Sequence, residues 1–238
     1  MPAPLQSPIR ILSTHAVLDV MDELGPLFER NTGRRLAFGY DPTNLLRLRI
    51  EGGESFDVVI MTRQALGEFA TMGVVVRDTC TDIGRSGLGV SVHESARRPD
   101  IGTVENFKRA LLEAKSVVRS RDGASGVYFD ALLGRLGIAE AMRGKVILGP
   151  GGRVAEFVAK GEADLAIQQI SELLPVTGAD FVGPVPPELQ HYTVFSAGVG
   201  VRSADPDMAK AFIGALVTPA AIALFKAKGL EPITLDVD

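Results

Sequence analysis

The sequence predicts an α/β protein of two domains, each with a mixed, mostly parallel sheet flanked by helices. Short apolar segments alternate with helical patterns along most of the 238 residues, and this alternation is typical of parallel sheets covered by helices. Three of the apolar segments run directly into a small, polar or glycine-rich turn that opens a helix. A glycine-rich segment near 85–92 and a return near 192–201 indicate two crossings between the domains.

The first half of the chain is expected to form three strand–helix pairs. Apolar runs predict strands at 9–12, 35–40 and 56–61. The helical patterns that follow them run from Ala16 to about residue 31, over 45–51 and over 64–72. Gly33 is placed to end the first helix, because glycine adopts the left-handed conformation that closes many helices.

The second half is expected to continue the alternation and then return to the first domain. Four prolines within 175–187 predict an irregular segment there. Strands are expected at 86–92, 116–119, 146–148, 163–167 and 194–201. Helices are expected over 104–114, from Val127 and from Val154. A further pair of helices is expected over 206–229, broken near Thr218 and Pro219. These elements predict a first domain of residues 1–84 completed by 194–238, with a second domain, 85–193, inserted between them.

Composition narrows the classes of partner and cofactor. The net charge of −4, from 25 basic and 29 acidic residues, argues against nucleic acid or an anionic membrane as partner. Cys80 is the single cysteine and the three histidines lie far apart, so neither a metal site nor a cofactor is expected. No apolar run is long enough for direct membrane insertion. The first residues lack a basic and an apolar signal region, so we expect a periplasmic location if a signal peptide was removed and a cytoplasmic one otherwise.

The three strand–turn–helix junctions predict an anion site. The turns are 13–15, 120–126 and 149–153, and they are rich in serine, threonine and glycine. Helix N-termini carry unpaired N–H groups and a partial positive charge, so they suit oxyanions and carboxylates. The alternative is that these are ordinary α/β turns that bind nothing.

The order and spacing of five segments resemble the type II periplasmic solute-binding proteins, and within them the molybdate-binding branch. The matching segments are 11–21, Phe-Asp-Val-Val-Ile at 56–60, Gly-Glu-Ala-Asp-Leu-Ala-Ile at 161–167, 194–199 and 212–225. The resemblance implies the two-domain periplasmic-binding-protein type II fold, with a ligand cleft between the domains.

The resemblance also implies binding positions, several of which depart from the family pattern. The first family serine falls on Ala16, which leaves Thr14 and His15 as the nearest polar groups. The second falls on Thr43, beside Asn44. The backbone donors fall near Ser125 and Gly126 and near Gly151 or Gly152, and the family's ligand tyrosine falls on Gln169. Alanine for serine and glutamine for tyrosine argue against a tetrahedral oxyanion such as molybdate.

Arginines near the expected site favour an organic anion instead. Arg63, Arg85, Arg119 and Arg153 lie close to strand ends or turns, and Ser86 adds a hydroxyl beside Arg85. The planar guanidinium binds carboxylates through two parallel hydrogen bonds, so two or more of them favour a di- or tricarboxylate. The alternative is that they are surface arginines.

Two functions from different classes remain open. The first is a solute-binding protein that delivers a small organic anion to an ABC-type membrane permease. The second is an isomerase, because segments at 85–90, 107–116, 124–126, 168–176 and 194–199 resemble aconitate isomerase-type proteins. That resemblance implies interconversion of cis- and trans-aconitate by proton transfer. His15 is the candidate base, since imidazole titrates near neutral pH.

Overall fold

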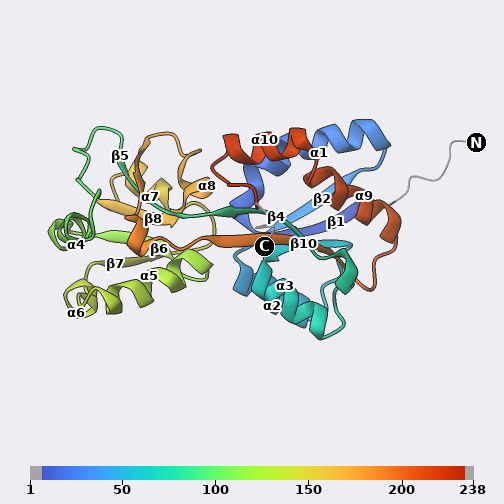
Figure 1. The fold of residues 1–238 in the computed structure, drawn as a ribbon, viewed down its shortest axis with the longest axis horizontal. Helices are drawn as coiled ribbons and strands as arrows, with labels where there is room; N and C mark the ends of the chain where they lie inside the picture. The colour runs from blue at the N-terminus through green and yellow to red at the C-terminus, as the bar shows by residue number, and fades with distance from the viewer. Residues whose placement is uncertain (1–6, 234–238) are drawn as a thin grey trace, which may run out of the picture. The chain divides into compact units, whose positions relative to one another are not determined.

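The computed structural model describes residues 7–233, which form two units with one five-stranded sheet each (Figure 1). Unit 1 takes its described residues from 7–85, 194–227 and 231–233, and unit 2 consists of Ser86–Thr193 and Lys228–Leu230. The α/β class with mixed sheets flanked by helices is confirmed.

The sheet of unit 1 has the strand order β2-β1-β3-β10-β4. Its strands are β1 (Ile9–Ser13), β2 (Leu36–Tyr40), β3 (Val58–Thr62), β4 (Thr81–Ser86) and β10 (Thr193–Val199). β1 runs parallel to β2 and β3, whereas β10 runs antiparallel to β3. The carboxyl ends of β1, β2 and β3 therefore lie at one edge of the sheet.

Helices cover both faces of this sheet. Figure 1 shows α1 (Leu18–Thr32), α9 (Pro206–Leu216) and α10 (Pro219–Ala227) on one face, and α2 (Thr43–Glu51) and α3 (Arg63–Thr71) on the other. Phe28 of α1 meets Phe212 of α9 edge to face, with ring centroids 5.3 Å apart. Gly33 closes α1 at φ 71°, as its position predicted. Two short 3₁₀ helices, η1 (His15–Val17) and η2 (Arg77–Thr79), complete the unit.

The sheet of unit 2 has the strand order β7-β6-β8-β5-β9. Its strands are β5 (Leu88–His93), β6 (Val117–Ser120), β7 (Val146–Gly149), β8 (Leu165–Gln169) and β9 (Ala179–Pro184). β6 runs parallel to β7 and β8, and β5 runs antiparallel to β8 and β9. The ends of β6, β7 and β8 share an edge with the start of β5, because Leu88 pairs with Gln169.

Apolar clusters fill both faces of the unit 2 sheet. One contains Phe107 of α4 (Val104–Glu113) and Phe129 of α5 (Ala124–Arg135), with Met142 of α6 (Ala139–Met142). The other contains Val158 of α7 (Ala155–Ala159) and Leu173 of α8 (Ile170–Leu173). A 3₁₀ helix, η3 (Pro187–Leu189), follows β9. The central strands are thus buried on both sides, which explains their continuous apolar runs.

Three elements correct the sequence prediction. Residues 179–184 form β9 rather than an irregular segment, because β9 is an edge strand and its proline stands at its last position. The strand expected at 86–92 is β5, which begins at Leu88, and an additional strand, β4, precedes it across Gly87. β4 escaped detection because aspartate, glycine and arginine interrupt its apolar pattern. α5 begins at Ala124, three residues earlier than expected.

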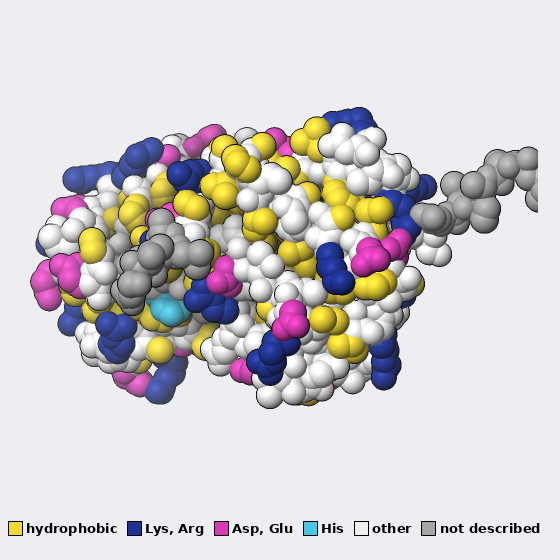
Figure 2. All heavy atoms as spheres, turned by 45° about the vertical axis from the view of Figure 1, so that its right-hand side comes forward, with side chains coloured by type: hydrophobic (Ala, Val, Ile, Leu, Met, Phe, Trp, Pro, Cys, Tyr) yellow, Lys and Arg dark blue, Asp and Glu magenta, His cyan; other side chains and the backbone are white. Residues whose placement is uncertain are grey.

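No single helix within residues 7–233 has the length and apolarity of a membrane span; α9 and α10 pass that test only as a pair, with a 60° bend between them. On the face that Figure 2 shows, basic and acidic side chains are interspersed.

Candidate functional site

Each unit presents its candidate residues where parallel strands end, the edge at which open α/β sheets bind ligands. In unit 1 this edge carries Thr14 and His15 after β1, Thr43 and Asn44 at the start of α2, and Arg63 after β3. In unit 2 it carries the end of β6 with Arg119, the first turn of α5 with Ser125 and Gly126, the turn after β7 with Gly152 and Arg153, and Gln169 at the end of β8. Arg85 and Ser86 lie where the chain passes from one unit to the other.

Thr14 and His15 form the junction after β1. Thr14 is 4% exposed; its N–H donates to the Ile60 carbonyl at 3.0 Å, and its hydroxyl accepts from the Ala16 N–H at 3.1 Å. This capping bond fixes the turn and leaves the hydroxyl proton for another acceptor. His15 is half-buried, and its ring lies 6.1 Å from the ring of Tyr40.

Tyr40 is a candidate that the sequence analysis did not include. It ends β2, stacks on Phe38, and has a buried hydroxyl without a hydrogen-bond partner among residues 7–233. Burial, followed by the nearby Asp22 and Asp19 carboxylates, raises the pKa of this phenol well above its usual value. Tyr40 is therefore a neutral donor beside His15. Its one sequence signal is its place directly before the Asp-Pro turn.

The start of α2 supplies backbone donors to the unit 1 edge. The N–H groups of Leu45 and Leu46 donate to the Pro42 carbonyl at 2.9 and 3.0 Å. The preceding N–H groups, those of Thr43 and Asn44, have no acceptor within the helix. Thr43 is 8% exposed and Asn44 is exposed.

Two predicted arginines already hold carboxylates of their own unit. Arg63 makes a two-point contact with Asp82, and these hydrogen bonds, followed by the negative charge of Asp82, raise the pKa of the guanidinium. Arg85 contacts one carboxylate oxygen of Glu231 at 3.0 and 2.9 Å. Side chains of Arg63 and Arg85 are 54% and 40% exposed, and exposed ion pairs contribute only about 0–1 kcal/mol, so an anionic ligand can compete for either arginine.

Arg119 holds the turn between β6 and α5. It is 8% exposed and donates to the carbonyls of Ser120 and Arg121 at 2.8 and 3.2 Å, while its other terminal nitrogen contacts Asp130. Its Nε is buried without a partner in the described part of the chain. Arg119 thus donates through one terminal nitrogen to the backbone of the turn and through the other to Asp130.

The first turn of α5 lies unusually close to β6. The Ser120 hydroxyl accepts from the Gly123 N–H at 3.0 Å. A Cβ added to Gly126 would stand 1.9 Å from the Ser120 carbonyl oxygen, so only glycine fits there. The N–H groups of Ala124 and Ser125 have no acceptor within the helix and remain available to an anion.

Gln168 organises the turn after β7. Its side-chain oxygen accepts from the Val154 N–H at 2.9 Å, and its amide nitrogen donates to the Gly152 carbonyl at 2.8 Å. Gly152 has a φ of 99°, which other residues adopt only with strain. These bonds place Arg153 at the unit 2 edge.

Arg153 interacts electrostatically with Glu172 of α8, a residue that the sequence analysis missed. Burial raises the pKa of Glu172 to about 8 from its ordinary 4.5, and the positive charge of Arg153 opposes this. Glu172 is only 9% exposed. Its sequence signal is one acidic residue inside the apolar stretch that follows Gln169.

Gln169 and Ser86 differ in what they leave available. Gln169 is 3% exposed and donates to the Thr193 hydroxyl at 2.7 Å, while its side-chain oxygen has no partner within residues 7–233. Ser86 donates to the Gly229 carbonyl and accepts from the Ser171 N–H, both at 3.3 Å. The side-chain oxygen of Gln169 can therefore still accept a hydrogen bond, whereas the hydroxyl of Ser86 is used to connect three segments of unit 2.

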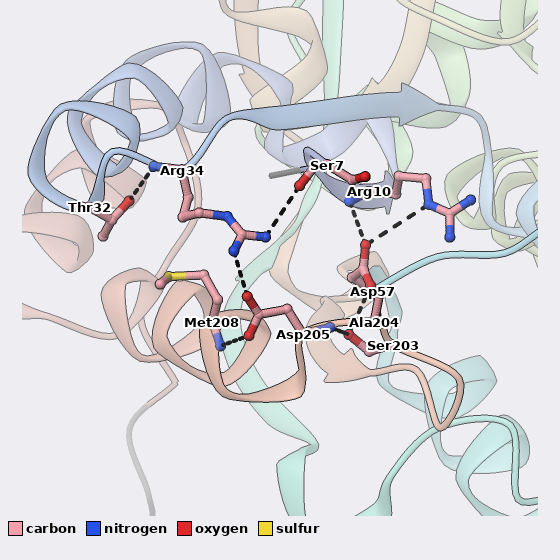
Figure 3. A network of polar contacts seen from close by, with 9 residues as sticks. All are labelled: Ser7, Arg10, Thr32, Arg34, Asp57, Ser203, Ala204, Asp205 and Met208. Carbon is pink, nitrogen blue, oxygen red and sulfur yellow. Dashed lines mark hydrogen bonds and ion pairs between the residues drawn. The ribbon is translucent and has the colours of Figure 1, made fainter. Parts of the chain in front are cut away.

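A separate polar network lies where the strands of unit 1 begin (Figure 3). Asp57 accepts from the Arg10 N–H and from the Ser203 hydroxyl, each at 2.8 Å, and Arg34 donates to Asp205 at 2.6 Å. A cavity of about 650 Å³ adjoins these residues. Because these charged groups form hydrogen bonds and ion pairs with one another and with the backbone, the network stabilises the sheet. Within residues 7–233, no three His, Cys, Asp or Glu side chains are grouped to hold a metal ion.

Comparison with known proteins identifies the family. The family model described as bacterial extracellular solute-binding protein matches residues 9–231. The chain is 32% identical to an aconitate isomerase of Pseudomonas sp over 231 residues, which cover 94% of this chain and 88% of the relative.

Solved structures share the fold at low identity. The periplasmic molybdate-binding protein of Azotobacter vinelandii superposes with a TM-score of 0.81 at 16% identity, covering 95% of this chain and 100% of that one. The sulfate-binding protein SubI of Mycobacterium tuberculosis superposes with a TM-score of 0.77 at 15% identity, covering 97% and 88%. The chain therefore belongs to the bacterial extracellular solute-binding protein family and has the type II periplasmic-binding-protein fold.

Proposed function

We propose that this chain binds a small di- or tricarboxylate of the aconitate type. The observation that carries the proposal is the 32% identity to an aconitate isomerase along 94% of the chain. The available donors fit such a ligand. They are backbone N–H groups at the starts of α2 and α5 and the hydroxyl of Thr14. Such donors hold carboxylates without requiring a metal.

As a second candidate function, we propose that the chain interconverts cis- and trans-aconitate. His15 supports it, because this half-buried imidazole stands at the unit 1 edge beside a neutral tyrosine. The base takes a proton from the substrate methylene, and the C–H electron pair forms a double bond to the central carbon. The original double bond then accepts the proton at its far carbon. Donors to the carboxylates stabilise the enolate-like charge that develops.

The two functions imply different partners. A binding protein would deliver the anion to an ABC-type permease from the periplasm, whereas an isomerase acts without that partner. Both functions require binding of the same kind of ligand, so one experiment with that ligand distinguishes binding alone from turnover.

The test is proton NMR of trans-aconitate in D₂O with a catalytic amount of the protein. New cis-aconitate signals with deuterium at the exchanging carbon establish the isomerase. Selective broadening of the ligand lines with no new signals establishes binding alone. Sharp, unchanged lines at every protein concentration refute the polycarboxylate proposal.

His15→Ala tests the assigned base. We expect turnover to fall at least about 100-fold, the range that general base catalysis contributes. His93→Ala is the matched control, because His93 lies in unit 2 and its ring contacts Ser95. Unchanged turnover in His15→Ala would exclude this histidine as the base.

A further inference from the structure

The backbone of Tyr40 is fixed at the unit 1 edge. Tyr40 is the last residue of β2 and stands opposite Ser13, the last residue of β1. The next N–H group, that of Asp41, donates to the Ser13 carbonyl at 3.1 Å. The turn that carries His15 begins directly after Ser13, so this pairing holds Tyr40 and His15 at neighbouring strand ends.

A series of aromatic contacts connects the Tyr40 ring with the core of unit 1. Phe28 of α1 meets Phe212 of α9, and Phe212 meets Phe38 of β2 with ring centroids 6.2 Å apart. Phe38 stacks on Tyr40 at 5.6 Å, with the two ring planes 6° apart. The imidazole of His15 follows, 6.1 Å from the Tyr40 ring. These contacts keep the phenol beside His15.

The Tyr40 hydroxyl is buried and has no hydrogen-bond partner among residues 7–233. Buried tyrosine hydroxyls usually have a partner, and a buried polar atom without one lowers the stability of the fold. Phenylalanine would keep the stacking on Phe38 and avoid that loss. The hydroxyl therefore indicates a hydrogen-bond partner that does not belong to the described chain.

The chemistry of this hydroxyl fits an anion, because it donates. Burial, followed by the charges of Asp22 and Asp19, raises the pKa of the phenol well above its usual value, so the group stays neutral and keeps its proton. A neutral O–H group donates to a carboxylate oxygen. Asp22 is exposed and Asp19 is half-buried, so solvent weakens their repulsion of an anion. The hydroxyl of Thr14 and the first N–H groups of α2 are further donors at the same edge.

We propose that Tyr40 is a ligand-binding residue, whose hydroxyl donates to a carboxylate oxygen of the anion beside His15. This rests on the proposed polycarboxylate binding. The hydroxyl then lowers the stability of the free protein and raises its affinity for the ligand. A hydroxyl with a purely structural role would raise stability instead.

The test compares Tyr40→Phe with the wild type, both as the full chain, by thermal unfolding and by calorimetric titration with trans-aconitate. Without ligand, the melting temperature of the variant should rise by about 2–4 °C, because a buried polar atom without a partner has been removed. Binding of trans-aconitate should weaken about 10- to 100-fold, the usual effect of losing one hydrogen bond to a charged group.

Tyr128→Phe is the matched control, because it removes a hydroxyl that has partners. The Tyr128 hydroxyl donates to the Leu189 carbonyl at 2.8 Å and accepts from Arg135 at 3.0 Å. The melting temperature of Tyr128→Phe should therefore fall, and its binding of trans-aconitate should change less than that of Tyr40→Phe.

Three results would overturn the assignment. Equal binding by the wild type and Tyr40→Phe is the result expected if a buried water molecule is the partner of the hydroxyl. A lower melting temperature of ligand-free Tyr40→Phe would mean that the hydroxyl has a partner within the protein. A wild-type chain that binds no di- or tricarboxylate refutes the proposed function and this assignment with it, and so differs from a chain that binds the ligand without Tyr40.

Discussion

Gly126 is the position at which one methyl group should have the largest measurable effect on unit 2. An added Cβ would stand 1.9 Å from the Ser120 carbonyl oxygen and 3.1 Å from Cδ of Arg119. Carbon and oxygen atoms that are not bonded pack at more than about 3 Å, so α5 and β6 must separate by about 1 Å. The atom in the way is backbone, so no rotamer change relieves the clash.

We therefore expect Gly126→Ala to lower the free energy of unfolding by about 2–3 kcal/mol, within the range measured for overpacked cores. In a chain of this size that corresponds to a loss of roughly 4–12 °C in melting temperature. The same shift moves the Ala124 and Ser125 N–H groups, so ligand binding should weaken as well.

Gly134 of the same helix provides the control. A Cβ there meets no atom within 4 Å, so Gly134→Ala should raise stability by about 0.5–1 kcal/mol through helix propensity alone. Thermal and urea unfolding followed by circular dichroism measure both variants. If Gly126→Ala is as stable as the wild type, the close approach of α5 to β6 is wrong, and so is the reasoning that places its N–H groups.

Two further predictions concern charged residues. Arg119→Met leaves the Ser120 carbonyl without its donor, so the free energy of unfolding measured in urea should fall by about 1–3 kcal/mol. Arg63→Gln breaks an exposed ion pair and should lower it by only about 0–1 kcal/mol. Equal losses in the two variants would contradict the structural role of Arg119. Glu172 has a pKa raised to about 8 from 4.5 in the folded state, so its protonated form stabilises the fold, fully below pH 4.5, and this stabilisation is lost as pH rises through 8. Unfolding free energies measured across that range should fall more steeply with pH for the wild type than for Glu172→Gln, by up to roughly 5 kcal/mol in total, because one pKa unit corresponds to about 1.4 kcal/mol. Parallel profiles would show that the pKa of Glu172 is not raised.

The sequence was sufficient for most of the fold because local patterns determine most of its elements. The apolar runs at 9–12 and 56–61 became β1 and β3, and Gly33 ended α1 in the left-handed conformation. β9 departs from the prediction because prolines in a sequence indicate a loop, whereas an edge strand tolerates them. The observed start of α5 is earlier than predicted because Ser125 and Gly126 have weak helix propensity, and close packing on β6 outweighs it.

The candidate site was less predictable, since partners distant in the sequence decide which side chains are available. Glu231, which holds Arg85, is 146 residues away, and Asp82, which holds Arg63, is 19 residues away. The hydrophobic periodicity of the sequence gives no information about such arginine–carboxylate pairs. The burial of Glu172 and of the Tyr40 hydroxyl likewise depends on how helices pack against the sheets.

Arg119 and Arg121 show how a strand end separates structural arginines from available ones. β6 is covered on both faces, so every polar group of Arg119 has to find its partner inside the protein or remain unsatisfied. Two residues later the chain has left the sheet, and Arg121 reaches the surface with its backbone still fixed by Gly149 and Arg119. A buried arginine in a central strand is thus expected to shape the turn, whereas an arginine just past the strand end is expected to face solvent. To make this distinction from sequence, the end of the strand would have to be known to within one residue. Sequence patterns do not give strand ends with that precision.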